Sequence, residues 1–244
     1  MRAILTYHSI DPSGSPISLS ASTFDRHVRW LRSGRVRVLT VEDLLAAPPA
    51  DDAVAITFDD GFANFGEMAA PRLADAGLPS TLFVVTDHVG RTNAWGGVPT
   101  QGIPHLPLLG WDALGRLSEQ GVTIGAHTRT HPDLTTTDAA RARDELRGSA
   151  DAIERALGRR PGVFAYPFGG LNREIAALAA TEFRWSCTTE FAAVGAAVLH
   201  ERVPRLDAYY FQRGEVLETF GSPAFARFVR RRHWLRQIRQ WIVR

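Results

Sequence analysis

The sequence predicts an α/β fold in which parallel strands, with helices packed around them, form an incomplete (β/α)7-like barrel. Short apolar runs alternate with longer amphipathic segments along the 244 residues, and this alternation favours a parallel sheet. Polar clusters follow directly after three of the apolar runs, at residues 59–60, 127–131 and 167–169. In (β/α) barrels the chemistry lies where strands end, so these clusters indicate one shared site.

Each predicted strand is a short apolar run that ends at a turn residue or a polar cluster. In chain order the predicted strands are Ala3–Tyr7, Val36–Leu39, Val54–Phe58, Thr81–Val85, Val122–Ala126, Val163–Tyr166, Trp185–Thr188 and Val203–Leu206.

Each predicted helix has apolar residues at helical spacing, as Phe24, Val28 and Leu31 illustrate after a Ser/Thr cap. We expect the Thr135–Thr137 run to cap the longest helix. The segment Asp87–Leu109, rich in Gly, Pro and aromatic residues, has no period and predicts a long loop over the site. In chain order the predicted helices are Ser22–Leu31, Val41–Leu45, Phe65–Ala76, Trp111–Gln120, Asp138–Leu157 and Glu174–Ala180.

Composition limits the compartment and the domain count. With 45% hydrophobic and 22% charged residues the chain is typical of a globular protein, and its length suits one catalytic domain, placed at 1–210, with a tail at 211–244. No apolar run is long enough for a transmembrane helix, and the N-terminus lacks the apolar region of a secretory signal. Cys187 is the only cysteine, which excludes an intrachain disulfide. We therefore expect a cytoplasmic protein.

The Asp59-Asp60-Gly61 cluster is a candidate for metal-assisted hydrolysis. Two adjacent carboxylates repel each other unless a cation or a proton separates them, and Gly61 permits a turn that aims both into one cavity. One carboxylate can then bind a metal while the other takes a proton. The alternative is an acidic N-terminus for the helix that follows.

The segment His127-Thr128-Arg129-Thr130-His131 places two imidazoles four residues apart. They can meet one ion if the segment makes a helical turn, and with one carboxylate they leave positions open for water. Two surface histidines at a chance spacing are the alternative. The pair begins where an apolar strand ends, which favours the metal site.

These two segments, together with Tyr166-Pro167-Phe168-Gly169, resemble the polysaccharide deacetylases, the family of the NodB-like homology domain. The resemblance covers roughly residues 1 to 210. It implies a NodB-type barrel and metal-dependent N-deacetylation of a sugar, with Asp60, His127 and His131 as ligands of zinc, or of cobalt or nickel. It further implies that Asp59 is the general base and that the backbone N–H of Phe168 helps hold the oxyanion, with Tyr166 and Pro167 in the same turn.

Two departures from the common family pattern lead to further assignments. The first strand ends in Thr6-Tyr7-His8-Ser9, which resembles an exopolysaccharide-type subgroup in which an N-terminal His fills the general acid's place. We therefore predict His8 as the general acid, with His200, or a purely structural His8, as alternatives.

The position two residues before Pro167 is Ala165, where many members carry an Arg that orients the catalytic carboxylate. Arg205 could reach that carboxylate from a later strand, or be a surface Arg.

The substrate prediction is a carbohydrate. Aromatic residues that could line a sugar groove are Trp95, Trp111, Tyr166, Phe168 and Trp185, of which Trp185 is the preferred candidate, although most aromatic residues belong to a core. Two other functions stay open, namely hydrolysis of an O-acetyl ester or another amide, and a catalytically silent carbohydrate-binding protein.

The tail at 223–244 predicts a basic amphipathic helix. Its apolar residues recur at about helical spacing, and the last 20 residues hold seven Arg and no acid. Such helices lie on anionic membrane surfaces. The alternative is a helix that packs on the barrel with an Arg-rich outer face, and nucleic acid is not expected because no recognition motif accompanies the charge.

Overall fold

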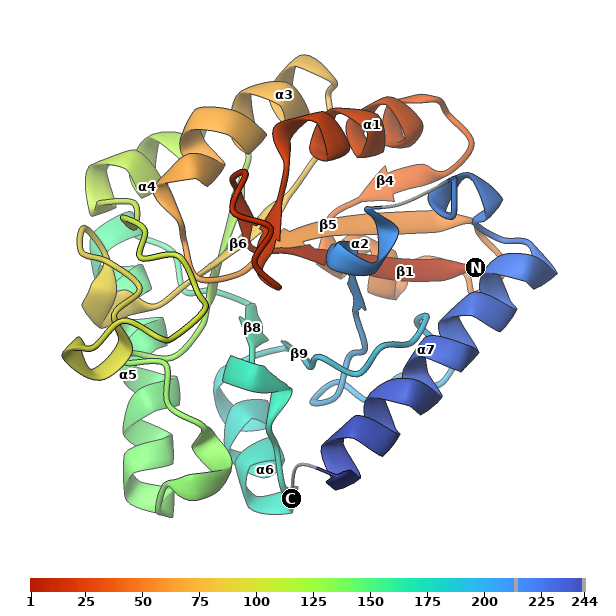
Figure 1. Cartoon of the computed structure of the whole chain (residues 1–244). Coiled ribbons are helices and arrows are strands. Elements are labelled where there is room, and N and C mark those ends of the chain that lie inside the picture. Colours follow the sequence, from red (N-terminus) through yellow and green to blue (C-terminus); the bar gives the residue numbers. More distant parts are fainter. Residues whose placement is uncertain (213–214, 243–244) are drawn as a thin grey trace.

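The computed structural model describes residues 1–212 and 215–242, with side chains in the last helix described as far as Ile238. At its centre is a curled sheet of eight parallel strands with helices around it, which confirms the predicted α/β barrel (Figure 1). The order is β10-β1-β5-β6-β7-β8-β9, and β4 pairs with the first half of β5. The strands are β1 (Arg2–Tyr7), β4 (Arg37–Leu39), β5 (Ala53–Phe58), β6 (Thr81–Val84), β7 (Thr123–Ala126), β8 (Val163–Ala165), β9 (Trp185–Cys187) and β10 (Leu206–Asp207). The short strands β2 (Ser9–Ile10) and β3 (Ser18–Leu19) form a separate pair.

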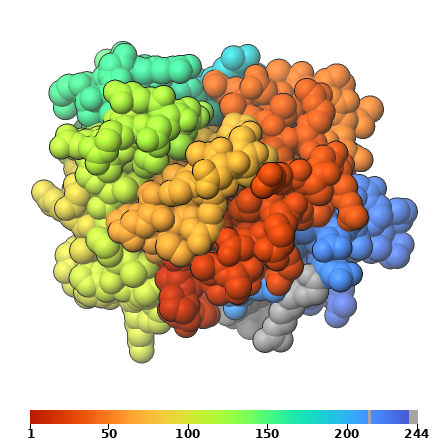
Figure 2. Space-filling view, turned by 90° about the horizontal axis from the view of Figure 1, so that it is seen from above, coloured from red at the N-terminus to blue at the C-terminus, as the bar shows by residue number. Residues whose placement is uncertain are grey.

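Helices cover the outside of the sheet, and their ends follow capping rules. They are α1 (Ala21–Arg32), α2 (Val41–Ala46), α3 (Ala70–Asp75), α4 (Trp111–Glu119), α5 (Ala139–Leu157), α6 (Arg173–Glu182) and α7 (Pro223–Ile242). The Ser20 and Thr40 side chains accept hydrogen bonds from the first turns of α1 and α2. Figure 2 shows the N-terminal helices packed side by side over one outer face, with the C-terminal segment at its edge.

Three local predictions were wrong in detail. Asp138, and not the preceding threonine run, caps α5, because its carboxylate accepts from the Arg141 N–H. The predicted helix at 65–76 begins as a π-helical segment, Phe65–Ala69, before α3. The last predicted strand is shifted, because β10 starts only at Leu206.

The segment from Val203 to Asp207 joins the two ends of the curled sheet. Val203 forms an isolated parallel bridge with Cys187 of β9, and Leu206 and Asp207 pair with Leu5 and Thr6 of β1. We call residues 203–207 the closing segment. Arg205 lies between the bridge to β9 and the pairing with β1. The fold therefore positions this residue where the two ends of the sheet meet.

Two hydrophobic clusters form the core because side chains alternate across each strand. The inner cluster fills the curled sheet and includes Ile4, Ala55, Phe83 and Cys187 from four different strands. The outer cluster lies between the strands and the helices, and residues such as Phe58 and Phe164 point into it. At the amino end of β1 the buried Arg2 donates to the carbonyls of Leu44, Ala47 and Gly195, whereas the acidic and histidine side chains lie at the carboxyl ends of the strands.

The tail helix α7 runs along the outside of the barrel (Figure 1). It packs there through Phe225 and Val229, which are buried, while Trp234, Leu235 and Ile238 are exposed. Its apolar residues therefore do not form a single stripe, and that part of the prediction was wrong. The side chains of residues 239–242, and Arg244, lie outside the described residues. The division at residue 210 stays a prediction. Among the described residues, no helix combines the length and the apolar character needed to cross a bilayer.

Candidate active site

Asp60, His127 and His131 converge at the carboxyl ends of β5 and β7. One ligand atom from each lies within 4.8 Å of the others, and Oδ1 of Asp60 is 3.5 Å from Nε2 of His127 and 3.4 Å from Nε2 of His131. All three residues are buried. One carboxylate and two imidazoles that share a centre fit a divalent metal with open coordination positions, as zinc hydrolases require.

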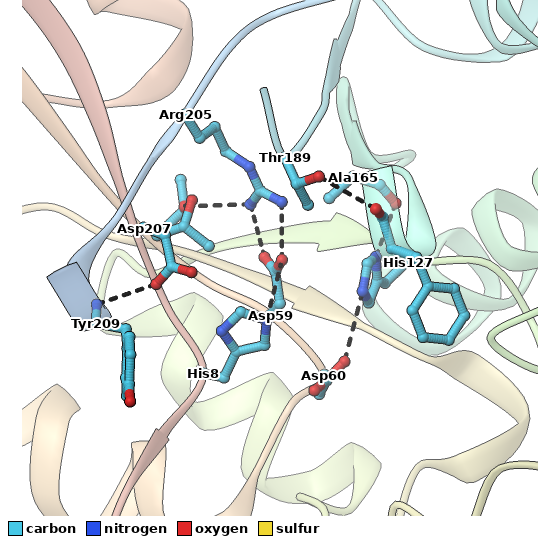
Figure 3. A network of polar contacts seen from close by, with 12 residues as sticks. His8, Asp59, Asp60, His127, Ala165, Thr189, Arg205, Asp207 and Tyr209 are labelled. Atoms are coloured by element: carbon cyan, nitrogen blue, oxygen red, sulfur yellow. Dashed lines mark hydrogen bonds and ion pairs between the residues drawn. The ribbon is translucent and has the colours of Figure 1, made fainter. Parts of the chain in front are cut away.

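The two imidazoles differ in their hydrogen bonding and in the direction of their pKa shifts. Nδ1 of His127 lies 2.7 Å from the carbonyl of Ala165, and if this nitrogen carries the proton, Nε2 presents its lone pair to the centre (Figure 3). Burial lowers the pKa of His131 to about 3, which keeps that imidazole neutral. Burial opposes protonation of His127 as well, but the neighbouring Asp60 raises its pKa overall. Metal binding requires the neutral form of both imidazoles, so it would compete with protonation of His127.

The backbone that presents these ligands is unusual. Asp60, Thr128 and His131 all have positive φ angles, between 62° and 74°, a region that non-glycine residues seldom adopt. The expected helical turn at 127–131 is therefore absent, and the two imidazoles meet through an irregular bend. Positive φ at a non-glycine residue costs on the order of 1 kcal/mol or more and persists only where surrounding contacts enforce it.

Glu145 of α5 supplies such contacts, and the sequence analysis missed it. Its buried carboxylate accepts hydrogen bonds from the N–H groups of Arg129 and Thr130, both at 2.9 Å, and from the Thr130 hydroxyl. Through Glu145, helix α5 thereby fixes the bend between His127 and His131. A signal was available, because Glu145 stands next to Leu146 on a face of α5 that also contains Ala142 and Ser149 and is otherwise uncharged.

Asp59 forms a buried, bidentate ion pair with Arg205. Nη1 and Nη2 of Arg205 donate to the two carboxylate oxygens of Asp59 at 2.7 and 2.8 Å (Figure 3). Nε of Arg205 donates to the Thr188 carbonyl. Arg205 is only 2% exposed, so the alternative that it is a surface residue is excluded. Burial alone raises the pKa of Asp59, but the charge of Arg205 outweighs it, and the net pKa lies far below the usual range.

His8 lies on the other side of Asp59. It follows β1, its side chain is about a quarter exposed, and its Nε2 is 3.8 Å from Oδ2 of Asp59. The register of β1 against β10 places Asp207 beside it, with Asp207 accepting from the Tyr209 N–H (Figure 3). Burial raises the pKa of Asp207, although the positive charges of His8 and Arg236 oppose this. The alternative residue His200 stacks on Trp185, with a ring distance of 4.1 Å.

The turn after β8 brings Phe168 to the metal ligands. Phe168 has a φ of 58°, and its own N–H donates to no acceptor among the described residues, while its carbonyl accepts from the Thr189 hydroxyl. Its ring is 64% exposed and lies 4.8 Å from that of His131. We call residues 166–170 the Phe168 turn. Pro167 begins it and Gly169 packs so closely on Thr189 that a Cβ would collide.

Two predicted substrate contacts were wrong. Tyr166 is fully buried, and its hydroxyl donates to the carbonyl of Glu201. Trp185 is 7% exposed and belongs to the inner cluster. Neither side chain can line a sugar groove in this structure. Trp95 from the long loop does reach the centre, because its ring stacks on His131 at 4.6 Å.

Known proteins resemble this chain in sequence. YxkH of Bacillus subtilis, which carries a provisional polysaccharide deacetylase name, is 25% identical over 193 residues, or 77% of this chain. The chain spans 64% of the length of that relative. The poly-beta-1,6-N-acetyl-D-glucosamine N-deacetylase of Staphylococcus epidermidis is 23% identical over 231 residues, covering 83% of this chain and 77% of the relative.

Solved structures share the fold. The Streptococcus pyogenes deacetylase PplD, in complex with acetate, has a TM-score of 0.72 at 22% identity, with 84% of this chain and 91% of that chain covered. IcaB from Ammonifex degensii has a TM-score of 0.70 at 21% identity, with 86% and 94% covered. The family model described as polysaccharide deacetylase matches residues 46–184, more than half of the chain, and this stretch holds both the Asp59-Asp60 pair and the two histidines. The chain therefore belongs to the polysaccharide deacetylase family.

Proposed function

We propose that the protein hydrolyses the N-acetyl group of an amino sugar within a glycan, an oligosaccharide or a lipid-linked saccharide, with Asp60, His127 and His131 holding a divalent metal. The observation that carries the proposal is the convergence of these three donors directly beside an ionised Asp59. The names of the relatives supply the bond type, because one of them is an N-deacetylase of poly-beta-1,6-N-acetyl-D-glucosamine.

The side chains divide the reaction among themselves. A divalent metal at this centre would polarise the acetyl carbonyl and lower the pKa of a nearby water. Asp59 accepts the proton of the attacking water, and the Phe168 N–H donates to the oxygen on which negative charge develops. His8 gives a proton to the leaving amine, so one water and one amide yield acetate and a free amino sugar. Arg205 holds the Asp59 carboxylate in place throughout.

Zinc is the metal that we propose, because one carboxylate and two imidazoles form a typical catalytic zinc set. The same donors also accept cobalt or nickel, since imidazole suits several divalent metals. Metal analysis of the purified protein, followed by reconstitution of the metal-free form with each ion, distinguishes these possibilities.

Acetate release tests the function. The metal-loaded protein should release acetate from N-acetylated oligosaccharides, and both a chelator and the change Asp59→Asn should abolish it. Asp59→Asn should still bind the metal, because Asp59 lies outside the ligand set. Release from O-acetylated sugars alone would move the activity to ester hydrolysis. Sugar binding without any acetate would indicate a non-catalytic carbohydrate-binding protein.

We further propose that α7 contacts an anionic membrane surface, which would place the protein in the cytoplasm at the inner face of the membrane. The outward face of α7 supports this, because it presents Arg227, Arg230 and Arg231 and then the exposed Trp234, Leu235 and Ile238. Basic residues beside exposed aromatic and aliphatic ones suit an anionic lipid surface. The packing of Phe225 and Val229 on the barrel equally suits a helix with a purely solvent-facing outer side.

Flotation with vesicles separates the two roles of α7. The protein should float with vesicles that contain phosphatidylserine and not with neutral ones, and Trp234→Ser combined with Ile238→Ser should abolish flotation. Absence of flotation of the unmodified protein with both vesicle types would remove the membrane proposal and leave the proposed chemistry untouched.

A further inference from the structure

His131 differs from His127 in how its imidazole ring is held. Nδ1 of His127 lies 2.7 Å from the Ala165 carbonyl (Figure 3), whereas Nδ1 of His131 is buried and has no hydrogen-bond partner among the described residues. The backbone of His131 is fixed, because its N–H donates to the Thr128 hydroxyl at 3.0 Å. A histidine that binds a metal through one ring nitrogen usually donates from the other, and that hydrogen bond orients the ring. At His131 the orientation of the ring is left to other contacts.

The indole ring of Trp95 provides such a contact. It stacks on the His131 ring with 4.6 Å between the ring centroids and 22° between the planes. The rings of Phe168 and His127 instead meet His131 at steep angles, 72° and 70°, with centroid distances of 4.8 and 4.9 Å. A nearly parallel stack opposes tilting of the imidazole, because tilting separates the two faces and loses their dispersion contact. Trp95 is therefore the aromatic ring best placed to keep His131 in one orientation.

The segment that carries Trp95, at residues 87–109, is cross-linked close to the indole. Asn93 is 4% exposed, and its side-chain amide donates to the Pro104 carbonyl and accepts from the Leu106 N–H, both at 2.9 Å. The imidazole of His88 packs edge-on against Trp95, with 4.9 Å between the centroids. Contacts from both sides of the loop thus fix the position of the indole.

The beginning of this loop is also attached to the bend between the two histidines. The Asp87 N–H donates to the Arg129 carbonyl at 2.9 Å, and the Asp87 carboxylate accepts from Nη2 of Arg129 at 2.9 Å. The neighbouring Thr86 N–H donates to the Thr128 carbonyl at 3.2 Å. The loop and the bend that presents His131 are therefore held together at their bases, so the stack of Trp95 on His131 joins two segments that are already in register.

We propose that Trp95 is a positioning residue for His131, with the indole face taking the place of the hydrogen bond that Nδ1 lacks. The inference rests on the proposed function for the metal that Asp60, His127 and His131 hold. The loop at residues 87–109 supplies no ligand among those three, yet it contributes to metal affinity because it keeps the Nε2 lone pair of His131 directed at the centre.

Zinc affinity tests the inference without any reliance on turnover. Zn²⁺ is titrated into the metal-free protein in competition with a chromophoric chelator. Trp95→Leu keeps an apolar side chain and removes the flat ring, whereas Trp95→Phe keeps a ring that can stack. We expect the Kd for zinc to be about tenfold weaker in Trp95→Leu and within about twofold of the original in Trp95→Phe, since losing the group that orients a ligating histidine costs 10–100-fold in affinity. Val98→Ala, at a 69% exposed position of the same loop, is the control and should leave the Kd unchanged.

A second background separates orientation of His131 from a general loss of structure. In His131→Ala protein, Trp95→Leu should weaken zinc binding no further, because the ring that it orients is gone. Equal Kd values for the unmodified protein and Trp95→Leu, equal losses in Trp95→Leu and Trp95→Phe, or an undiminished loss in the His131→Ala background would each overturn the inference. Absence of zinc binding by the unmodified protein would overturn it together with the proposed metal site. Zinc binding without acetate release would remove the proposed activity alone, and the Kd comparison would still decide the role of Trp95.

Discussion

The Asp59–Arg205 pair shows how single residues set the chemistry of the site. Two opposite charges are buried here with two short hydrogen bonds, a geometry that offsets the cost of removing both from water. Burial would raise the pKa of Asp59, but the charge of Arg205 lowers it far below its usual range, so Asp59 is ionised at neutral pH. A carboxylate with a low pKa is a weak base, so the proposed role of Asp59 as general base depends on its being charged, fixed and close to the attacking water.

Replacing Arg205 should weaken catalysis through Asp59. In Arg205→Gln the pKa of Asp59 rises, so the base becomes protonated at a higher pH and the acid limb of the kcat/KM profile moves upward. We expect a loss of about 100-fold in kcat/KM at neutral pH, with metal content retained. Arg202→Gln, which removes an exposed ion pair, should leave the profile in place. An unshifted acid limb in Arg205→Gln would contradict the assigned role.

The proposed role of His8 has a different signature. His8→Ala should lower turnover of N-acetylated sugars by about 100-fold while metal content stays normal, because the amine can no longer receive a proton as it leaves. An aryl acetate whose leaving group needs no proton serves as the control, and its hydrolysis should fall much less. Equal losses on both substrates would mean that His8 acts on another step.

The sequence alone identified the site residues that belong to short local motifs. The Asp-Asp-Gly and His-x-x-x-His segments identified four side chains that the structure brings together. The contact between Arg205 and Asp59 was one of two open alternatives. Trp185 was misassigned because strand alternation points it into the inner cluster, and one residue of shift reverses the face. Glu145 was missed because its hydrogen bonds connect a helix to a bend that no local pattern predicts.

Among the elements, the Phe168 turn leaves no room for an added side chain. Its glycine at position 169 has a φ of 73°, and an added Cβ would lie 2.1 Å from the Thr189 hydroxyl oxygen and 2.6 Å from the Thr189 nitrogen. The turn therefore cannot accept a side chain here unless Thr189 or the turn itself shifts. Because an oxyanion donor must be held in place to be effective, a small displacement of this turn is expected to be felt directly in the rate.

Gly169→Ala tests that sensitivity. We expect kcat to fall by about 100-fold, the range found when one oxyanion donor is lost, with little change in metal binding. Gly121→Ala is the matched control, because Gly121 also has a positive φ but an added Cβ would meet nothing within 4 Å. It should lower stability slightly and keep kcat. Full activity in Gly169→Ala would show that the turn does not position a donor.

Elements were predicted best where periodicity alone decides them. The buried strands and the helices were located almost to the residue, because apolar spacing and caps are local signals. The bend between the histidines was predicted as a helical turn, yet positive φ values at Thr128 and His131 depend on contacts from α5. The closing segment was placed too early, since its two short pairings depend on β1 and β9, which lie far away in sequence.

For the molecule as a whole, a buried histidine couples stability to pH. His27 of α1 lies between the Tyr7 hydroxyl, at 3.0 Å, and the carbonyl of Phe211, at 3.1 Å. Burial lowers its pKa to about 4. The imidazole thus joins β1, α1 and the turn before α7, and protonating it inside the fold is unfavourable.

The free energy of unfolding should therefore decrease as the pH falls. In the unfolded chain His27 has a pKa near 6.5, so between about pH 6.5 and pH 4 the unfolded state binds more protons than the folded one. The expected loss from this residue is about 3 kcal/mol at the lower end of that window. Urea denaturation at several pH values, compared between the unmodified protein and His27→Gln, measures it. Parallel pH curves for the two proteins would refute the assignment.

The closing segment has a consequence for how the protein folds during its synthesis. A ribosome delivers Asp59 early, and Arg205 emerges 146 residues later. Until then, the nascent chain has no guanidinium group to pair with Asp59. Synthesis of the closing segment therefore completes both the join between the two ends of the sheet and the Asp59–Arg205 pair. A product that terminates before residue 203 would lack both of these features and would not hold Asp59 in place.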